Sequence, residues 1–262
     1  QFLRIWRSQC YASVQEVCRV RDALVMKPER KAQLEKCIAI LGLPAFRNLQ
    51  LLDAALTHSS YANENKNRHV HFNERLEFLG DAILDLVIGE YLFMHYPHMP
   101  EGELSKARAS VVSEMPLASV FGSYHIGDYM LMGRGEQLSG GRTRTSILAD
   151  AFEAVVGAVY IDHSYGAART FILHHLKGYL ELVKNGNYGK DYKTLFQEFV
   201  QREGEQHIAY ELCREEGPDH DKTFYMEVTV NGTVLGEGKG KTKKDAEQHA
   251  AHEALKKLGG IP

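Results

Sequence analysis

The chain has 262 residues, of which 44% are hydrophobic and 25% are charged, and its formal net charge at pH 7 is −3. This length suffices for one large domain or two ordinary ones, and the composition is that of a globular protein and excludes a disordered chain. The small negative charge excludes a uniformly basic nucleic-acid binder. Any affinity for nucleic acid therefore has to come from local clusters of basic residues.

All apolar runs are shorter than the roughly 18–20 residues that a membrane-spanning helix needs, so we expect no membrane segment. The four cysteines show no CxxC pair and no regular spacing. This pattern argues against a disulfide framework or a zinc site and favours a reducing compartment, and we expect the protein in the cytoplasm.

Residues 1–28 form an N-terminal extension to which we assign no function. Arginines interrupt its apolar stretch, which is not typical of a secretory signal and weakly resembles a transit peptide. Met26 would also be a natural start of the chain.

Residues 29–183 follow a mostly helical pattern, with apolar side chains three and four positions apart. Pro97 and Pro100 interrupt this pattern, and residues 133–141 are expected to form a Gly-rich connector. Because no segment alternates clearly between apolar and polar residues, we predict an all-α domain.

The composition changes at residues 184–190, which we predict to be a short polar linker. Beyond it, residues 193–203 predict a helix, and residues 224–230 alternate as in a half-buried strand. The dipeptide at 231–232, Asn-Gly, is typical of a tight hairpin turn that leads into the next strand. Thr242 is a suitable N-cap for a helix over residues 243–258. We therefore predict a small α+β domain over residues 191–262, with one helix, three strands and a second helix.

The segment 73–87 predicts a helix that is apolar on nearly every side, and such a helix is expected to be buried over most of its surface. It nevertheless carries Glu74, Glu77 and Asp81, whose spacing of three and four residues places them on one face. Like charges repel, and burial of each one costs several kcal/mol unless a counter-charge is present.

A second predicted helix, residues 147–162, is almost wholly apolar except for Asp150 and Glu153, which again lie three residues apart. Two such pairs would make an oxygen-ligand site for a hard divalent cation, with Mg²⁺ as the default ion. The alternative is that these acids are solvated or pair with arginine, and Arg75 is adjacent. For a single acidic pair that is the commoner situation. Two pairs in apolar helices favour a metal site without proving one.

The run NERLEFLGDAIL (73–84) resembles the signature of the ribonuclease III family, and SILADAFEAVVGAVYID (146–162) resembles its second catalytic helix. LTHSSYANE (56–64) and EGELSKARASVVS (101–113) match two further characteristic stretches. The resemblance extends from about residue 33 to the C-terminus, and no catalytic position departs from the family's pattern.

The resemblance implies a catalytic cluster of Glu77, Asp81, Asp150 and Glu153 that binds Mg²⁺, for which Mn²⁺ can substitute, with Asp81 and Glu153 most directly tied to turnover. It places Glu74 and Glu101 around that cluster. It also implies hydrolysis of double-stranded RNA to 5′-phosphate and 3′-hydroxyl ends by a homodimer, whose two sites cut opposite strands and leave a short 3′ overhang. No small-molecule cofactor is expected.

Phe78 matches the family position that inserts into the partner subunit. From spacing alone, an ordinary core aromatic residue is the favoured alternative.

GEGKGKTKKDAEQHAA (236–251) and DYKTLFQEFVQ (191–201) resemble the double-stranded RNA-binding domain that follows the nuclease domain in bacterial-type members. Residues 239–244 hold four lysines and no acid, at the start of a predicted helix whose N-terminus also favours phosphate. The resemblance assigns RNA contacts to Gln197, Glu198, His220, Lys241, Thr242, Lys243 and Lys244. The alternative is a solvated lysine turn and an inert loop histidine. We expect His249 and His252 to be surface residues.

Two other functions remain open at this stage. One is a non-catalytic RNA-binding or ribosome-associated protein that retains the fold, against which the intact carboxylates argue. The other is a metal-dependent phosphohydrolase of small nucleotides, which would not need the C-terminal domain. The favoured function is the processing of ribosomal-precursor and other structured RNA.

Overall fold

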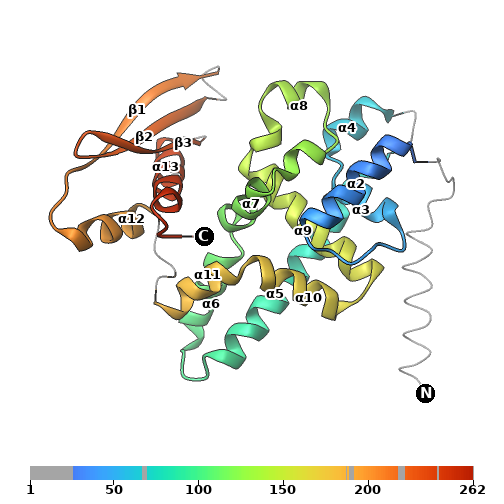
Figure 1. Ribbon diagram of the computed structural model, residues 1–262, viewed down its shortest axis with the longest axis horizontal. Coiled ribbons are helices and arrows are strands. Elements are labelled where there is room, and N and C mark those ends of the chain that lie inside the picture. Colours follow the sequence, from blue (N-terminus) through green and yellow to red (C-terminus); the bar gives the residue numbers. More distant parts are fainter. Residues whose placement is uncertain are drawn as a thin grey trace.

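The computed structural model describes residues 26–66, 70–186, 188, 192–217, 222–240 and 242–261. Figure 1 shows a helical body and, beside it, a smaller unit in which a sheet is packed against helices. The predicted fold class, an all-α domain followed by an α-β-β-β-α domain, is confirmed. Within the described ranges no helix is long and apolar enough to cross a membrane.

The helical body is made of α-helices joined by short connections and 3₁₀ turns. Its elements are α2 (Pro28–Ile40), α3 (Leu49–Ala55), α4 (Ser59–Glu64), α5 (Glu74–His95), α6 (Glu101–Val111), α7 (Glu114–Ser123), η2 (Ile126–Tyr129), α8 (Arg134–Leu138), η3 (Gly141–Thr143), α9 (Thr145–Asp162), α10 (Tyr165–His175) and α11 (Lys177–Lys184).

Helix α9 lies at the centre of this body. Its apolar residues are buried on nearly all sides, and they include many alanines, valines and a glycine. Helices α5, α7, α3 and α10 pack around it. Aromatic side chains fill one side, where the rings of Phe121 and Phe152 meet edge to face with centroids 5.1 Å apart. The side chains of α9 are therefore placed by neighbours on several sides.

Helices α5 and α9 touch backbone to backbone. A Cβ atom added to Gly80 would lie 1.8 Å from the carbonyl oxygen of Glu153, and one added to Gly157 would lie 2.3 Å from the carbonyl oxygen of Leu76. Both distances are far inside van der Waals contact, so only glycine fits at the two positions. This close approach fixes the distance and the rotation of α5 relative to α9.

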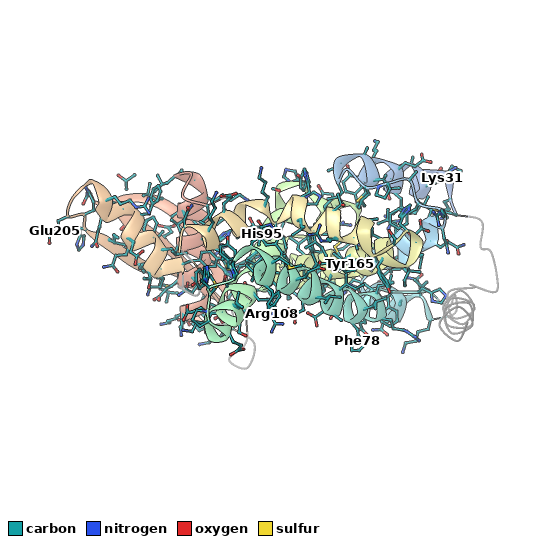
Figure 2. All side chains as sticks on the ribbon, turned by 90° about the horizontal axis from the view of Figure 1, so that it is seen from below. Lys31, Phe78, His95, Arg108, Tyr165 and Glu205 are labelled. Carbon is teal, nitrogen blue, oxygen red and sulfur yellow. The ribbon has the colours of Figure 1, made fainter. Side chains whose placement is uncertain are left out.

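The expectation that the helix over residues 73–87 is buried on most sides is wrong. Its inner face is buried, but Phe78, Leu86 and Phe93 are 81%, 58% and 69% exposed. These three residues, seven or eight positions apart, lie along one side of α5 and are called the apolar stripe below. Figure 2 shows Phe78 at the outer edge of the body. Phe78 is therefore not an ordinary core aromatic residue.

The predicted connector at residues 133–141 contains the short helix α8 and leads into η3. Arg142 donates hydrogen bonds to the carbonyl oxygens of Gly127 and Met130, and Arg144 pairs with Glu136 at 2.5 Å. These long-range contacts order the segment, and the local Gly-rich composition gives no sign of them.

The C-terminal unit consists of α12 (Tyr192–Val200), η4 (Gln201–Glu203), β1 (Ile208–Glu216), β2 (Thr223–Val230), β3 (Thr233–Gly240) and α13 (Lys243–Lys257). The strands form an antiparallel sheet in the order β1-β2-β3. Asn231 and Gly232 both have positive φ, which confirms the predicted hairpin turn.

The sheet packs on α13 through glycines. In β3, Cβ atoms added to Gly236, Gly238 or Gly240 would each lie 2.6 Å or less from the backbone of α13. The face of α13 that meets them is made of alanines, including Ala246 and Ala250, which are fully buried. The alternating glycines of the GEGKG sequence are thus explained by packing.

The N-terminus of α13 is capped as predicted, because the Thr242 hydroxyl accepts a hydrogen bond from the backbone N–H of Asp245. The expectation that both histidines of this helix are surface residues is wrong. His252 is only 3% exposed and packs edge to face against Tyr192. His249 is half-buried, with its Nδ1 at the carbonyl oxygen of Lys239. His252 lies on the side of α13 that meets α12, and His249 lies against β3; the sequence alone does not identify either contact.

The contact between α5 and α9 leads to a stability prediction. Gly157→Ala should lower the free energy of unfolding by about 1–3 kcal/mol, because the added methyl group forces the helices apart. Gly102→Ala is the matched control, since Gly102 is also helical but has nothing within 4 Å of an added Cβ. The control should be neutral or stabilising by up to about 1 kcal/mol. Denaturant unfolding measures both, and equal effects of the two changes would contradict the account.

Candidate metal centre and RNA-binding surface

Four carboxylates from two helices come together where α5 and α9 touch. Glu77 and Asp81 flank Gly80 on α5, and Gly80 lies against the backbone of Glu153 on α9. Asp150 is one turn before Glu153 on the same helix. We call Glu77, Asp81, Asp150 and Glu153 the carboxylate quartet. Asp81 is exposed and the other three are half-buried.

The carboxylate quartet is electrostatically strained. Burial, followed by the charges of Asp81, Asp150 and Glu77, raises the pKa of Glu153 to about 8. Burial and the charge of Glu77 raise the pKa of Asp150 to about 6. The pKa of Glu77 is also raised, first by burial and then by Glu74 and Asp81. At neutral pH part of this cluster therefore holds protons.

No basic side chain compensates these charges in the described parts of the chain. The ion pairs there involve none of the quartet. Arg75, the neighbour that could have served as a counter-charge, is exposed and pairs with none of them. The nearby Arg108 pairs with Asp85 instead, at 3.6 Å. Within the described ranges, the quartet therefore has no ion-pair partner.

The donor set fits a hard divalent cation, because all four groups are carboxylates, which are the ligands that Mg²⁺ and Mn²⁺ prefer. Among the residues that the structure describes, no three such side chains already converge closely enough to enclose an ion. Within the described residues, the four carboxylates thus supply suitable oxygen ligands but do not form a closed metal cage.

Glu74 and Glu101, which the sequence assigns to the surroundings of the cluster, differ in their placement. Glu74, in the first turn of α5, is one of the charges that raise the pKa of Glu77. Glu101 begins α6, is exposed and accepts a hydrogen bond from the Ser105 hydroxyl. It is not among the groups that shift the quartet. Glu74 is thus linked to the cluster by its charge, and the role of Glu101 stays a prediction from the sequence.

Glu114, at the start of α7, was missed by the sequence reasoning. Its charge raises the pKa of both Asp150 and Glu153. In the sequence it follows a serine at a predicted helix start, where an acid is ordinary. No spacing relates it to the other acids, so only the packing of α7 on α9 identifies it.

The LTHSS motif ties the start of α5 to the segment that precedes α9. The carbonyl oxygen of Thr57 accepts from the backbone N–H of Asn73, the residue before α5, and His58 donates to the carbonyl oxygen of Leu131. The Ser60 hydroxyl accepts from the backbone N–H of Gly133. The motif therefore contributes to the site by holding the backbone of its neighbours.

Those of the expected RNA-binding residues that the structure describes lie on α12 and at the start of α13. Gln197 and Glu198 are exposed on α12, and Lys243 and Lys244 are exposed in the first turn of α13, directly after the capping residue Thr242. Lys243 also lies 3.7 Å from a carboxylate oxygen of Glu215. His220 and Lys241 lie outside the described residues.

Lys239, which belongs to the same lysine-rich stretch, faces the helical body. Its Nζ donates a hydrogen bond of 3.3 Å to the Thr143 hydroxyl, and burial followed by the charge of Arg144 lowers its pKa. A second bond, from Lys256 Nζ to the Ser119 hydroxyl, also joins the two units. Lys239 therefore differs from Lys243 and Lys244, which are open to solvent.

Comparison with known families matches both units. Residues 48–180 match the model described as "Ribonuclease-III-like", and residues 192–258 match the "Double-stranded RNA binding motif". The first match contains all of the carboxylate quartet, and the second contains the RNA-binding residues proposed from the sequence.

Similar proteins extend over most of the chain. A protein named "Ribonuclease 3" from Clostridium acetobutylicum is 48% identical over 230 residues, which are 88% of this chain and 99% of that protein. One of the same name from Treponema denticola is 46% identical over 233 residues, 89% of this chain and 94% of that protein. Among solved structures, the nuclease domain of ribonuclease III from Campylobacter jejuni is 42% identical, with a TM-score of 0.50, and the match covers 55% of this chain and 92% of that one.

The raised pKa of Glu153 predicts how stability depends on pH. The folded protein holds this proton up to a pKa of about 8, whereas the ordinary value of 4.5 applies to the unfolded chain. Between these values the folded state binds more protons, so the free energy of unfolding falls as the pH rises. In the presence of chelator, the melting temperature of the protein should therefore decrease as the pH is raised from about 5.5 to about 8. Glu153→Gln should flatten this slope, and an unchanged slope would refute the assignment.

Proposed function

Because this chain belongs to the ribonuclease III family, we propose that its carboxylate quartet is the metal centre of an endonuclease that cuts double-stranded RNA. The observation that carries this proposal is the uncompensated quartet at the contact between α5 and α9. Mg²⁺ is the proposed ion, with Mn²⁺ as a substitute. The catalytic domain comprises residues 29–183, and residues 184–190 link it to the RNA-binding domain at 191–262.

The chemistry follows from the residues. A bound divalent cation supplies charge neutralisation at the phosphate oxygens and a water of lowered pKa. Asp81 on α5 and Glu153 on α9 would hold that cation, and Glu77 and Asp150 would complete the set of oxygen ligands. Glu153 would have to bind the cation as a carboxylate and so give up the proton that its raised pKa favours. In the overall hydrolysis a water oxygen bonds to phosphorus, the bond to the 3′-oxygen breaks, and that oxygen takes up a proton given up by the water, so the products carry a 5′-phosphate and a 3′-hydroxyl.

The C-terminal domain supports duplex RNA as the substrate. Lys243 and Lys244 stand at a helix N-terminus, where positive charge and free backbone N–H groups both favour phosphate. Gln197 and Glu198 offer polar groups for 2′-hydroxyls in the shallow groove of A-form RNA. His220 and Lys241 stay predictions from the sequence. Such contacts follow the shape of a duplex and not its base sequence, which suits ribosomal-precursor and other structured RNA in the cytoplasm.

The apolar stripe supports a homodimer. Phe78, Leu86 and Phe93 form a row of exposed large apolar side chains on α5, and rows of this kind mark protein interfaces. Asp81, three residues after Phe78, lies beside this row on the same helix. A two-fold pairing of α5 with its copy would therefore set two metal centres near one interface. Two centres acting on opposite strands give a short 3′ overhang.

The rival function is a non-catalytic RNA-binding or ribosome-associated protein that keeps the fold. It would have no use for an acidic cluster in which the pKa values of Glu77, Asp150 and Glu153 are raised and to which the described residues supply no counter-charge, so the electrostatics favour the enzyme. The phosphohydrolase of small nucleotides is less favoured because it leaves the C-terminal domain without a role.

The enzyme proposal is tested with Glu153→Gln. This change keeps the size of the side chain and removes a metal ligand, so it should abolish Mg²⁺-dependent cleavage of long duplex RNA and leave binding of that RNA within about twofold, because binding rests mainly on phosphate contacts elsewhere. Cleavage is followed on gels, and binding is followed by filter retention in chelator. If Glu153→Gln lost binding and cleavage equally, the assigned role would be contradicted. If the unmodified protein bound duplex RNA but did not cleave it with Mg²⁺, the rival function would be supported.

The dimer proposal is tested with Phe78→Glu, which places a charge in the apolar stripe. Leu138→Glu is the control, since Leu138 on α8 is 80% exposed, nearly the same as Phe78 at 81%, but lies outside the stripe. Sedimentation velocity should show a dimer for the wild type and for the control, and a monomer for Phe78→Glu. A wild-type monomer, or a dimer that survives Phe78→Glu, would refute the assigned interface.

A further inference from the structure

Hydrogen bonds and an apolar contact join the C-terminal unit to the helical body. Lys239 Nζ on β3 donates to the Thr143 hydroxyl in η3 at 3.3 Å. Lys256 Nζ on α13 donates to the Ser119 hydroxyl on α7 at 3.1 Å. The side chain of Leu182 on α11 packs against the apolar cores of both units. Because these contacts come from η3, α7 and α11, together they restrict the rotation of the C-terminal unit as well as its distance from the body.

A cleft of about 860 Å³ lies between the two units. It is bounded by α7 and η3 on the side of the body and by β2, β3 and α13 on the side of the C-terminal unit. The four residues of the two bonds, Ser119, Thr143, Lys239 and Lys256, all line it. Across this cleft the two surfaces are not closely packed, so the relative orientation of the units depends on the individual bonds that bridge it.

Both ends of the bond between Lys239 and Thr143 are fixed by their own surroundings. The glycines on either side of Lys239 lie against the backbone of α13, and its carbonyl oxygen accepts a hydrogen bond from His249 Nδ1. The Thr143 hydroxyl donates its proton to the carbonyl oxygen of Gly140 at 3.3 Å. Its lone pairs are therefore left to accept from the lysine.

The two bonds link the elements that hold RNA to the helix that carries half of the carboxylate quartet. Helix α13 begins with the exposed Lys243 and Lys244 and carries Lys256 in its last turn. Thr143 stands two residues before α9, the helix of Asp150 and its partner acid. Lys243 and Lys244 stay open to solvent in this arrangement, so the contact between the units does not cover the residues proposed to bind phosphate.

We propose that Lys239 and Lys256 are positioning residues, which hold the RNA-binding domain at one orientation to the metal centre and so determine where along a bound duplex the strands are cut. The inference rests on the proposed function and extends it. Contacts to phosphates and 2′-hydroxyls follow the shape of a duplex and not its sequence, so they do not select a cutting position by themselves. The competing explanation is that the two bonds belong to a closed, RNA-free form that duplex RNA has to open.

The test removes the two acceptors on the helical body, Ser119→Ala and Thr143→Val together in the full chain, and leaves every proposed metal ligand and RNA contact in place. End-labelled duplex RNA is cut with Mg²⁺, and the cut positions and the rate at saturating protein are read from gels. The double variant should spread the cuts over more positions. It should also cut at the wild-type positions roughly threefold to tenfold more slowly, since each hydrogen bond contributes a factor of about two to ten. Duplex binding in chelator should stay within about twofold.

Two further variants serve as controls. Thr143→Ser, made together with the natural Ser119, keeps the accepting hydroxyl and should give the wild-type pattern of cuts. Thr170→Val removes an exposed hydroxyl of α10 whose bond, to the carbonyl oxygen of Gly166, stays within its own helix. It should cut as the wild type does.

The position of the cuts is a readout that a purely structural role would not change, because a less stable protein loses active molecules without moving the cuts of those that remain. Wild-type cut positions in the double variant would overturn the inference. If duplex binding also became tighter, the closed RNA-free form would be supported instead. An equal spread of cuts in Thr170→Val would overturn the inference as a general effect of lost hydroxyls. If the wild type cuts duplex RNA and the double variant cuts identically, only this inference fails, whereas a wild type that cuts no duplex RNA refutes the proposed function itself.

Discussion

The backbone contact between α5 and α9 is the constraint on which the site depends. Gly80 and Gly157 let the two helices approach until a Cβ atom at either position would overlap a carbonyl oxygen of the other helix. At that distance, side chains close to the contact on each helix share one small region. Glu77 and Asp81 on one helix and Glu153 on the other are brought together in this way, without any attractive interaction among them. Their repulsion is opposed by the packing of two apolar helices.

The C-terminal domain also depends on glycines that allow close backbone contact, here between a strand and a helix. Alternating glycines of β3 let the sheet meet the alanine face of α13, and the residues between them are turned to the other side of the strand. The result places the start of α13, with Lys243 and Lys244, in a fixed position relative to the sheet. In both domains the small residues take no part in catalysis or binding, but their close packing determines the positions of the charged residues.

Much of this arrangement could be predicted from the sequence. The spacing of apolar residues is three to four positions in the first part of the chain and changes to alternation in the last part, and this change predicts the fold class. The positions of Glu77, Asp81, Asp150 and Glu153 within apolar helices identify these acids as candidates. These are local signals, carried by neighbouring residues. The features that were not predicted depend on contacts distant in sequence. Glu114 can be related to the acids of α9 only through the packing of α7 on α9. The connector before α9 is ordered by the contacts of Arg142 and Arg144. The burial of His252 and the exposure of Phe78 depend on which face of a helix meets the rest of the protein.

The central claim is that the two helices hold one divalent cation between them. It is tested most directly by anomalous diffraction from crystals of the full chain soaked in Mn²⁺. The account predicts a peak within coordination distance of carboxylate oxygens from both α5 and α9, with Glu153 among the ligands. A peak bound by residues of one helix alone, or Mn²⁺ bound only elsewhere on the protein, would contradict it.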